Sequence, residues 1–206
     1  MAAIDPTNRL SVGLDLYPVA PQHQADLVAL LVKEQLPMWA ASPYLVSASV
    51  HQSLDNVCVF VYSQWEPWFD YRPLPRPTGL AEFSTPDSQL LQVFASRSKT
   101  AAITIEEGTT VTHLAEFRMM PANQGELVKR ASQAVDEAIQ DEGLLSATFH
   151  RSLDGTRVYN YGQWASQAAF EAILNKPGFD PTQKPYWEGV ARNEFHLYKV
   201  AHTQSR

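Results

Sequence analysis

The chain contains one segment twice. Residues 47–65, SASVHQSLDNVCVFVYSQW, return ninety-nine residues later at 146–164 as SATFHRSLDGTRVYNYGQW, with ten identical positions in an ungapped alignment. Upstream, PQHQADLV at 21–28 matches PANQGELV at 121–128 at a spacing of one hundred. Solenoid repeats are only about 20–50 residues long. The spacing therefore predicts a small domain that is duplicated in tandem.

The length of 206 residues suits two domains of this size, since domains usually hold about 100–200 residues. We place the first domain at 10–100 and the second at 109–203. Each is small but long enough to bury a core. The hydrophobic fraction of 45% is ordinary for a globular protein.

The composition limits the classes of partner. A net charge of −6, with no cluster of Lys and Arg, argues against nucleic acid. No apolar run reaches the roughly 20 residues of a membrane span, and the N-terminus has no signal-peptide pattern. Cys58 is the only cysteine, which excludes an intrachain disulfide and a thiolate metal cage; we expect it in the core. These features predict a soluble protein of a reducing compartment, the cytoplasm.

Each half has the same expected order of elements: strand, helix, strand, strand, a variable element and a final strand. Asp154-Gly155 is a strong signal for a two-residue hairpin turn between two of these strands. Asn123 begins a capping-box pattern at the start of the second-half helix. In the first half, the helix over 23–36 is expected to stop at Pro37.

This order matches the split βαβ, ferredoxin-like motif, a four-stranded sheet with helices on one face. The other face of such a sheet is bare and must be covered. Two copies in one chain can cover each other. The predicted fold class is therefore α+β, with tandem ferredoxin-like domains whose sheets pack face to face as an intramolecular α/β barrel.

The two halves differ after their shared Trp. Residues 66–80 of the first half, EPWFDYRPLPRPTGL, contain four prolines, where the second half has the helical pattern SQAAFEAIL. Proline at this density excludes a helix. The segment is either a packed surface loop, or a lid or wall over an apolar ligand.

One face of the last hairpin strand is unusual for a core strand. Alternation places Val158, Asn160, Gly162 and Trp164 on that face. A buried amide without a hydrogen bond costs about 1–3 kcal/mol, so Asn160 needs a partner. That partner is either a neighbouring side chain or water, or the oxygen of a ligand above Gly162. The first half has Val61 at the position of Asn160, which favours a working pocket in the second half alone.

The stretch 144–174, LLSATFHRSLDGTRVYNYGQWASQAAFEAIL, resembles the antibiotic-biosynthesis monooxygenase domain through its HRSLDGTRV hairpin and N-x-x-x-W pattern. The first half matches through its first helix and its HQSLDN…YSQW hairpin. The resemblance implies a ferredoxin-like fold that pairs into barrels. It also implies cofactor-free oxidation of anthrones or phenols to quinones in aromatic-polyketide pathways, with the substrate as its own reductant.

The resemblance further implies a site between the sheet and the helices that uses the Asn and Trp of the pattern, here Asn160 and Trp164. Asn160 would hold the substrate oxygen or a peroxy intermediate by hydrogen bonds, and Trp164 would form a flat apolar wall. The chain departs from the family at Ala115, where many members have Asn, and at Phe170, where some have Tyr. The residues expected to contact the substrate are Val158, Gly162, Phe170, Tyr186 and Trp187.

Histidines are the remaining candidates for chemistry. His150 lies by alternation on one face with Ser146, Thr148 and Ser152, and is a candidate catalytic base for a phenol. Its alternative role is a hydrogen bond within the hairpin. Further candidates are His51, His113 and His196. No His, Asp and Glu spacing forms a metal site.

Three functions follow from these patterns. The leading prediction is a cofactor-independent monooxygenase that oxidises a polycyclic aromatic in secondary metabolism. Its partners would be a small aromatic substrate and O2, with no nucleic acid and no membrane, and the two-domain chain could also form a homodimer. The second is a non-catalytic ligand-binding or scaffold module of the same fold. The third is a haem-binding or haem-degrading protein, which requires a His ligand to iron.

Overall fold

The computed structural model describes residues 2–108, 110–174 and 185–206. The chain divides into two compact units. The first unit comprises residues 1–92, 104–108 and 198–206, and the second comprises 93–103 and 109–197. The final nine residues thus belong to the first unit, whereas the sequence-based boundaries placed most of them in the second domain.

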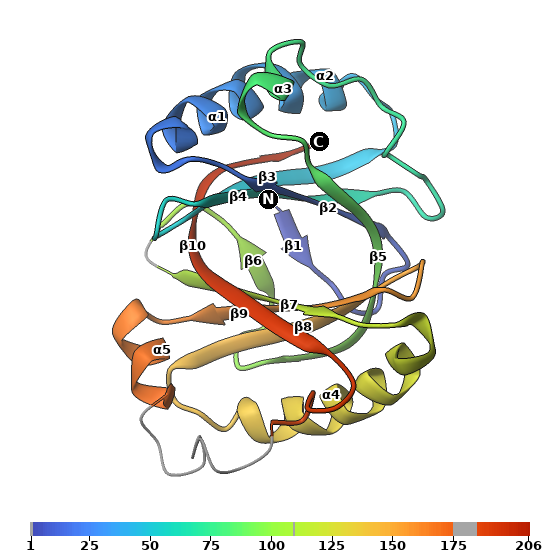
Figure 1. The fold of residues 1–206 in the computed structure, drawn as a ribbon, viewed down its shortest axis with the longest axis vertical. Helices are drawn as coiled ribbons and strands as arrows, with labels where there is room; N and C mark the ends of the chain where they lie inside the picture. The colour runs from blue at the N-terminus through green and yellow to red at the C-terminus, as the bar shows by residue number, and fades with distance from the viewer. Residues whose placement is uncertain (1, 109, 175–184) are drawn as a thin grey trace. The chain divides into compact units, whose positions relative to one another are not determined.

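The first unit follows the expected order of strand, helix, strand, strand and short helix (Figure 1). Its elements are β2 (Ser11–Pro18), η1 (Pro21–His23), α1 (Gln24–Leu30), η2 (Leu31–Gln35), α2 (Leu36–Ala40), β3 (Leu45–Ser53), β4 (Cys58–Trp65), α3 (Leu80–Phe83) and the beginning of β5 (Asp87–Ser98). A separate two-stranded sheet joins β1 (Ala2–Ile4) to β6 (Ile103–Ile105).

The second unit repeats this order. Its elements are β7 (Val111–Arg118), η3 (Pro121–Asn123), α4 (Gln124–Ala138), β8 (Leu144–Ser152), β9 (Arg157–Trp164), α5 (Gln167–Leu174) and the beginning of β10 (Arg192–Ser205). Gly155, between β8 and β9, has a φ of 81°. This left-handed conformation is one that glycine adopts without steric cost. The turn is therefore where the sequence predicted it.

The strands are hydrogen-bonded in the closed order β10-β3-β4-β2-β5-β8-β9-β7. The order closes because β5 and β10 each begin in one unit and end in the other. In the first unit, the end of β10 pairs with β3 and the beginning of β5 pairs with β2. The predicted α+β class, an α/β barrel of ferredoxin-like halves, is confirmed.

The first-unit helix does not stop at Pro37 as predicted; it continues to Ala40. A proline has no N–H to donate to the preceding turn. The chain accommodates it with the π-helical segment η2, at whose end the Leu36 N–H donates to the Leu31 carbonyl five residues back. Pro37 then occupies the first turn of α2, where a missing N–H costs little. The extra turn carries Trp39 into the core.

The predicted capping box at the start of α4 is also absent. Asn123 has a helical conformation and makes no capping hydrogen bond, because the 3-10 turn η3 already leads into the helix. The Asn123 side chain instead donates from Nδ2 to the Val190 carbonyl at 3.2 Å. Asn123 therefore links the start of α4 to the segment that follows α5 in the same unit.

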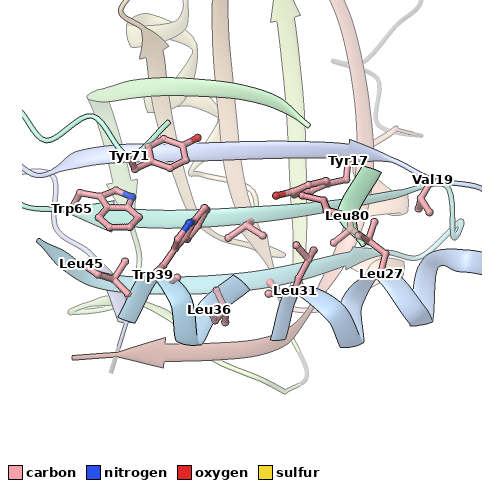
Figure 2. Close-up of a cluster of buried hydrophobic side chains, with 14 residues drawn as sticks. Tyr17, Val19, Leu27, Leu31, Leu36, Trp39, Leu45, Trp65, Tyr71 and Leu80 are labelled. Atoms are coloured by element: carbon pink, nitrogen blue, oxygen red, sulfur yellow. The ribbon is translucent and has the colours of Figure 1, made fainter. Parts of the chain in front are cut away.

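The core of the first unit lies between β2–β4 and the helices α1 and α2. Figure 2 shows the side chains of α1 and α2 pointing toward the strands, with Trp39, Trp65 and Tyr71 gathered at one end. The Trp39 ring meets Trp65 and Tyr71 edge-on, with both centroid separations 5.5 Å. Tyr71 comes from the proline-rich segment 66–80, which therefore packs onto the sheet of its own unit.

Candidate active site

The strand pair β7–β9 presents one face to the helices α4 and α5 (Figure 1). In an antiparallel pair, directly opposite residues point to the same face. The opposite pairs on this face are Val111 with Trp164, His113 with Gly162, Ala115 with Asn160 and Phe117 with Val158. On the other side of β9, β8 places Ala147 opposite Gly162 and Phe149 opposite Asn160.

Two polar atoms of this face are buried without a hydrogen-bond partner among the described residues: Asn160 Oδ1 and Trp164 Nε1. Burying such a group unpaired costs about 1–3 kcal/mol. Oδ1 can only accept and an indole Nε1 can only donate. The face therefore offers one acceptor and one donor that the described part of the protein leaves unused.

The glycine between these residues leaves a space that two ring nitrogens face. A Cβ added at Gly162 would lie 3.4 Å from Trp164 Nε1 and 3.6 Å from His113 Nδ1. Both distances are ordinary van der Waals contacts, so a methyl group would fit at this position and touch both nitrogens. Trp164 Nε1 and His113 Nδ1 therefore lie beside the same residue of the face.

Aromatic rings surround the two unpaired atoms. Phe170 of α5 meets Trp164 edge-on at 5.3 Å. Tyr186 and Trp187 lie 5.7 and 5.5 Å from the Phe117 ring and pack against the same apolar cluster. Burial raises the pKa of Tyr186 well above its usual range, so its hydroxyl stays protonated. The structure thus brings the predicted substrate-contacting residues, Val158 and Gly162 included, around Asn160 and Trp164.

His150 is placed elsewhere. It lies opposite Tyr159 on β8 and β9, while its neighbour Phe149 lies opposite Asn160. Successive residues of a strand point to opposite faces, so His150 and Asn160 do not share a site. Burial lowers the pKa of His150 to about 4, although hydrogen bonds with the Thr148 and Tyr159 backbone raise it in part. The grouping of His150 with Asn160 and Trp164 is corrected accordingly.

His113 is the histidine that the structure adds to the site. Sequence reasoning gave it no more weight than His51 or His196, because nothing along the chain relates it to Gly162. The signal that identifies it is the β7–β9 register, which sets the two residues opposite each other. Register is a property of strand pairing and is not visible in the local pattern.

The equivalent face of the first unit is closed by the protein itself. Trp65 Nε1 donates to Ser63 Oγ at 2.8 Å, and Val61 stands where the second unit has Asn160. Gly13 occupies the position of His113, and a Cβ there would lie 2.5 Å from the Tyr71 ring. The Tyr71 ring therefore occupies the space that a side chain at Gly13 would need, where the second unit has His113.

Tyr71 is held there by a buried ionic network. Its ring stacks on Trp65 at 5.7 Å, and its hydroxyl donates to Asp15 Oδ1 at 2.9 Å. Asp15 is fully buried and pairs with Arg76, at 2.6 Å between Arg76 Nη1 and Asp15 Oδ2. Tyr17 donates to the same carboxylate at 3.2 Å. The remaining unpaired buried atom in the described chain is Trp39 Nε1, within this aromatic cluster.

Within residues 2–108, 110–174 and 185–206, no three His, Cys, Asp or Glu side chains are grouped as a metal site would require. Over the same residues, no helix is long and apolar enough to cross a membrane.

Solved structures with the same fold include proteins that are described as oxidases and monooxygenases. An anthrone oxidase-like protein of known crystal structure matches it with a TM-score of 0.78 and 20% identity, over 99% of this chain and 96% of that one. A candidate monooxygenase from Fusobacterium nucleatum matches with a TM-score of 0.68 and 8% identity, over 97% and 96%. At these identities the likeness concerns the fold, an α/β barrel of ferredoxin-like halves.

Sequence comparison defines the family. The sequence model of the antibiotic biosynthesis monooxygenase family matches residues 110–185. Tetracenomycin-F1 monooxygenase of Streptomyces glaucescens is 36% identical over 88 residues, which are 42% of this chain and 78% of that protein. The chain belongs to the antibiotic biosynthesis monooxygenase family, and its enzyme class is therefore that of the oxygen-using oxidoreductases.

Proposed function

We propose that the second unit oxidises a polycyclic phenol or anthrone to a quinone with O2, in aromatic-polyketide or related secondary metabolism, without a cofactor. The observation that carries the proposal is the unpaired acceptor and donor, Asn160 Oδ1 and Trp164 Nε1, within one aromatic cluster. The names of the relatives, tetracenomycin-F1 monooxygenase and anthrone oxidase-like protein, support the same substrate class.

A hydroxyanthrone matches the unused hydrogen-bonding groups of this face. Its hydroxyl can donate to Asn160 Oδ1, and its carbonyl can accept from Trp164 Nε1. Charge builds on the carbonyl oxygen as the substrate becomes an enolate, so the Trp164 N–H bond strengthens toward the transition state. The flat rings of Phe170 and Trp187 suit the apolar surface of such a substrate.

In this proposal the first unit is the structural partner of the second. Its equivalent face carries Val61 in place of Asn160, and Tyr71 packs against Gly13 in place of His113. The repeated segments and the matching element order support an origin by tandem duplication. One copy then kept an open face, and the other closed it with its own side chain.

The test is oxygen consumption with a panel of anthrones and naphthols, without metal, flavin or nicotinamide. Wild type should consume O2 with at least one compound, and Asn160→Val should lose at least about 100-fold in rate, as when a transition-state hydrogen bond is removed. Valine is chosen because Val61 occupies the same position in the first unit. Thermal unfolding of the variant should be unchanged or occur at higher temperature, since an unpaired buried acceptor is removed.

Two results would overturn the proposal. Unchanged oxygen uptake in Asn160→Val would show that the site assignment is wrong. Quenching of tryptophan fluorescence by the panel, without oxygen uptake or product in wild type, would instead identify a ligand-binding module of the same fold.

A further inference from the structure

Neither Asn160 nor Trp164, the two residues proposed to hold the substrate, can take up a proton from it. The oxidation of a phenol or anthrone by O2 begins with loss of a proton, because the enolate is the electron-rich form. An amide such as Asn160 does not accept a proton at neutral pH, and the Trp164 indole N–H is a donor only. A base must therefore be found among the neighbouring side chains.

The described side chains of this face leave one candidate. Those on β7, β8 and β9 that point the same way as Asn160 include eight that are apolar, indole or glycine: Val111, Ala115, Phe117, Ala147, Phe149, Val158, Gly162 and Trp164. The exposed Arg151 also lies on this face, but its guanidinium can only donate hydrogen bonds. Tyr186 stays protonated at neutral pH because burial raises its pKa. His150 points to the opposite face. His113 remains.

We infer that His113 is the catalytic base of the second unit, which takes a proton from the aromatic substrate and later returns it to the peroxide. This inference rests on the proposed function. Its geometric support is that His113 lies directly opposite Gly162, and that a Cβ added at Gly162 would lie 3.6 Å from His113 Nδ1 and 3.4 Å from Trp164 Nε1. The base and the indole donor thus lie side by side on the face that carries Asn160.

The surroundings of His113 keep its imidazole available. The ring is flanked by Phe170 of α5 at 4.8 Å and Phe195 of β10 at 5.1 Å. Over the described residues, burial alone accounts for its lowered pKa of about 4, with no hydrogen bond or charged side chain contributing. The groups that face it from β9, α5 and β10 are uncharged. At neutral pH the imidazole is therefore neutral, with a free lone pair.

The proton transfers balance the reaction. His113 removes one C–H proton of the anthrone CH2, directly or through its enol, and the carbanion forms a C–O bond with O2 to give a peroxide anion. The His113 imidazolium protonates the distal oxygen of this anion. Neutral His113 then removes the second C–H proton as the O–O bond breaks, which leaves a C=O group and hydroxide. Hydroxide takes the proton from His113, so CH2 and O2 become C=O and H2O.

The first unit supports the assignment by contrast. Where the second unit has His113, Asn160 and Gly162, the first has Gly13, Val61 and Ser63. The unit whose face is filled by Tyr71 thus lacks both the base and the amide. Three differences that fall on adjacent positions of one strand pair agree with a single loss of chemistry in that unit.

The test is the kinetics of His113→Gln, which keeps the size and hydrogen-bonding capacity of the side chain but cannot carry a proton. The rate constant kcat should fall about 100- to 10,000-fold, as is usual when a general base is removed, while KM changes less than about threefold. The variant rate should rise about tenfold per pH unit toward the pKa of the substrate, because only pre-ionised substrate reacts. The wild-type rate should be nearly flat from pH 6 to pH 8.

Two further variants make the result decisive. His113→Gly, which copies Gly13, should recover activity when free imidazole is added, and a purely structural role would not produce this rescue. His23→Gln, at an exposed position of the first unit, should match wild type. A His113→Gln enzyme with wild-type kcat and pH profile, or a His113→Gly enzyme without rescue, would overturn the inference. If the wild-type protein oxidises none of the panel, the proposed function itself is wrong. If Asn160→Val is inactive while His113→Gln is fully active, only the assignment of His113 as the base is wrong.

Discussion

At the scale of single residues, one hydroxyl decides whether the Trp shared by the two units has a hydrogen-bond partner. Ser63 Oγ accepts from Trp65 Nε1 at 2.8 Å and donates to the Gly13 carbonyl at 3.3 Å. The second unit has Gly162 at that position, and Trp164 Nε1 is left unpaired. A buried donor without a hydrogen bond destabilises a packed core. In a binding site the same donor can form its hydrogen bond with an oxygen atom of the substrate.

The variant Gly162→Ser should therefore close the second site. Its Cβ fits at 3.4 and 3.6 Å from the two ring nitrogens, and its hydroxyl can pair with Trp164 as Ser63 pairs with Trp65. We expect oxygen uptake to fall at least about 100-fold, while the free energy of unfolding rises by about 0.5–1.5 kcal/mol, the net value of one hydrogen bond. Urea unfolding measures the second effect. Gly162→Ala, as control, should lose activity without the same gain, and full activity in Gly162→Ser would contradict this account of the open position.

At the scale of elements, the proline-rich segment 66–80 acts as part of the first-unit core. It contributes Tyr71 and Arg76, which meet Asp15 of β2 inside the unit. Arg76 also donates to the Ser88 hydroxyl at 3.1 Å, which ties the segment to β5. Of the two interpretations that its composition allowed, a packed loop is the one that these contacts support. The equivalent residue of Asp15 in the second unit is Ala115, which needs no such partner.

Removal of Arg76 should be severely destabilising, because Asp15 would remain buried without its cation. We expect Arg76→Met to lower the free energy of unfolding by about 3–5 kcal/mol, the usual cost of breaking a buried ion pair, as measured by urea unfolding. The double variant Asp15→Ala with Arg76→Met should recover most of this loss. After that change Tyr17 keeps its hydrogen bond with Gln35, and Tyr71 keeps its bond to the Gln89 carbonyl. A loss below about 1 kcal/mol in Arg76→Met would show that the pair is not structural.

At the scale of the whole molecule, each unit buries one copy of the repeated histidine. His51 and His150 are 0% and 1% exposed, and burial lowers their pKa values to about 3 and about 4. Both pKa values lie below the ordinary value of 6.5 for an unfolded chain. The unfolded state therefore binds protons that the folded state cannot, in the window between these pKa values and 6.5.

The protein should accordingly lose stability in mild acid. His113, whose pKa burial lowers to about 4, contributes in the same way. Stability is complete above about pH 6.5 and falls as the pH decreases, with a slope that approaches about 4.1 kcal/mol per pH unit when all three histidines are protonated only in the unfolded state. Urea unfolding from pH 7.5 to pH 4.5 measures this slope. In His150→Gln the slope should be about two thirds as steep. A free energy of unfolding that does not change over this range would contradict the burial of these side chains.

The fold class could be predicted from local patterns in the sequence, because the signals for helices, strands and turns lie within short stretches of chain. Alternation of side chains showed which residues share a face of β9, and the turn signal at Gly155 placed the hairpin. The internal repeat then supplied a control, Val61 against Asn160, that singled out the second half. Two local predictions were wrong because a short irregular helix adjoins the predicted helix end. The 3-10 turn η3 precedes α4, so Asn123 does not need to cap it, and the π-helical segment η2 lets the first-unit helix continue past Pro37.

The tertiary structure alone decided which residues meet. The β7–β9 register sets His113 opposite Gly162, and the β8–β9 register leaves His150 on the other face. Pairing with β3 places the end of β10 in the first unit. These contacts join residues that are far apart in the chain. The packing of many side chains across the sheet determines them jointly. The unpaired state of Asn160 Oδ1 and Trp164 Nε1 is likewise a property of their packed surroundings. Sequence could name both residues, but only packing could leave these two atoms buried without a hydrogen-bond partner.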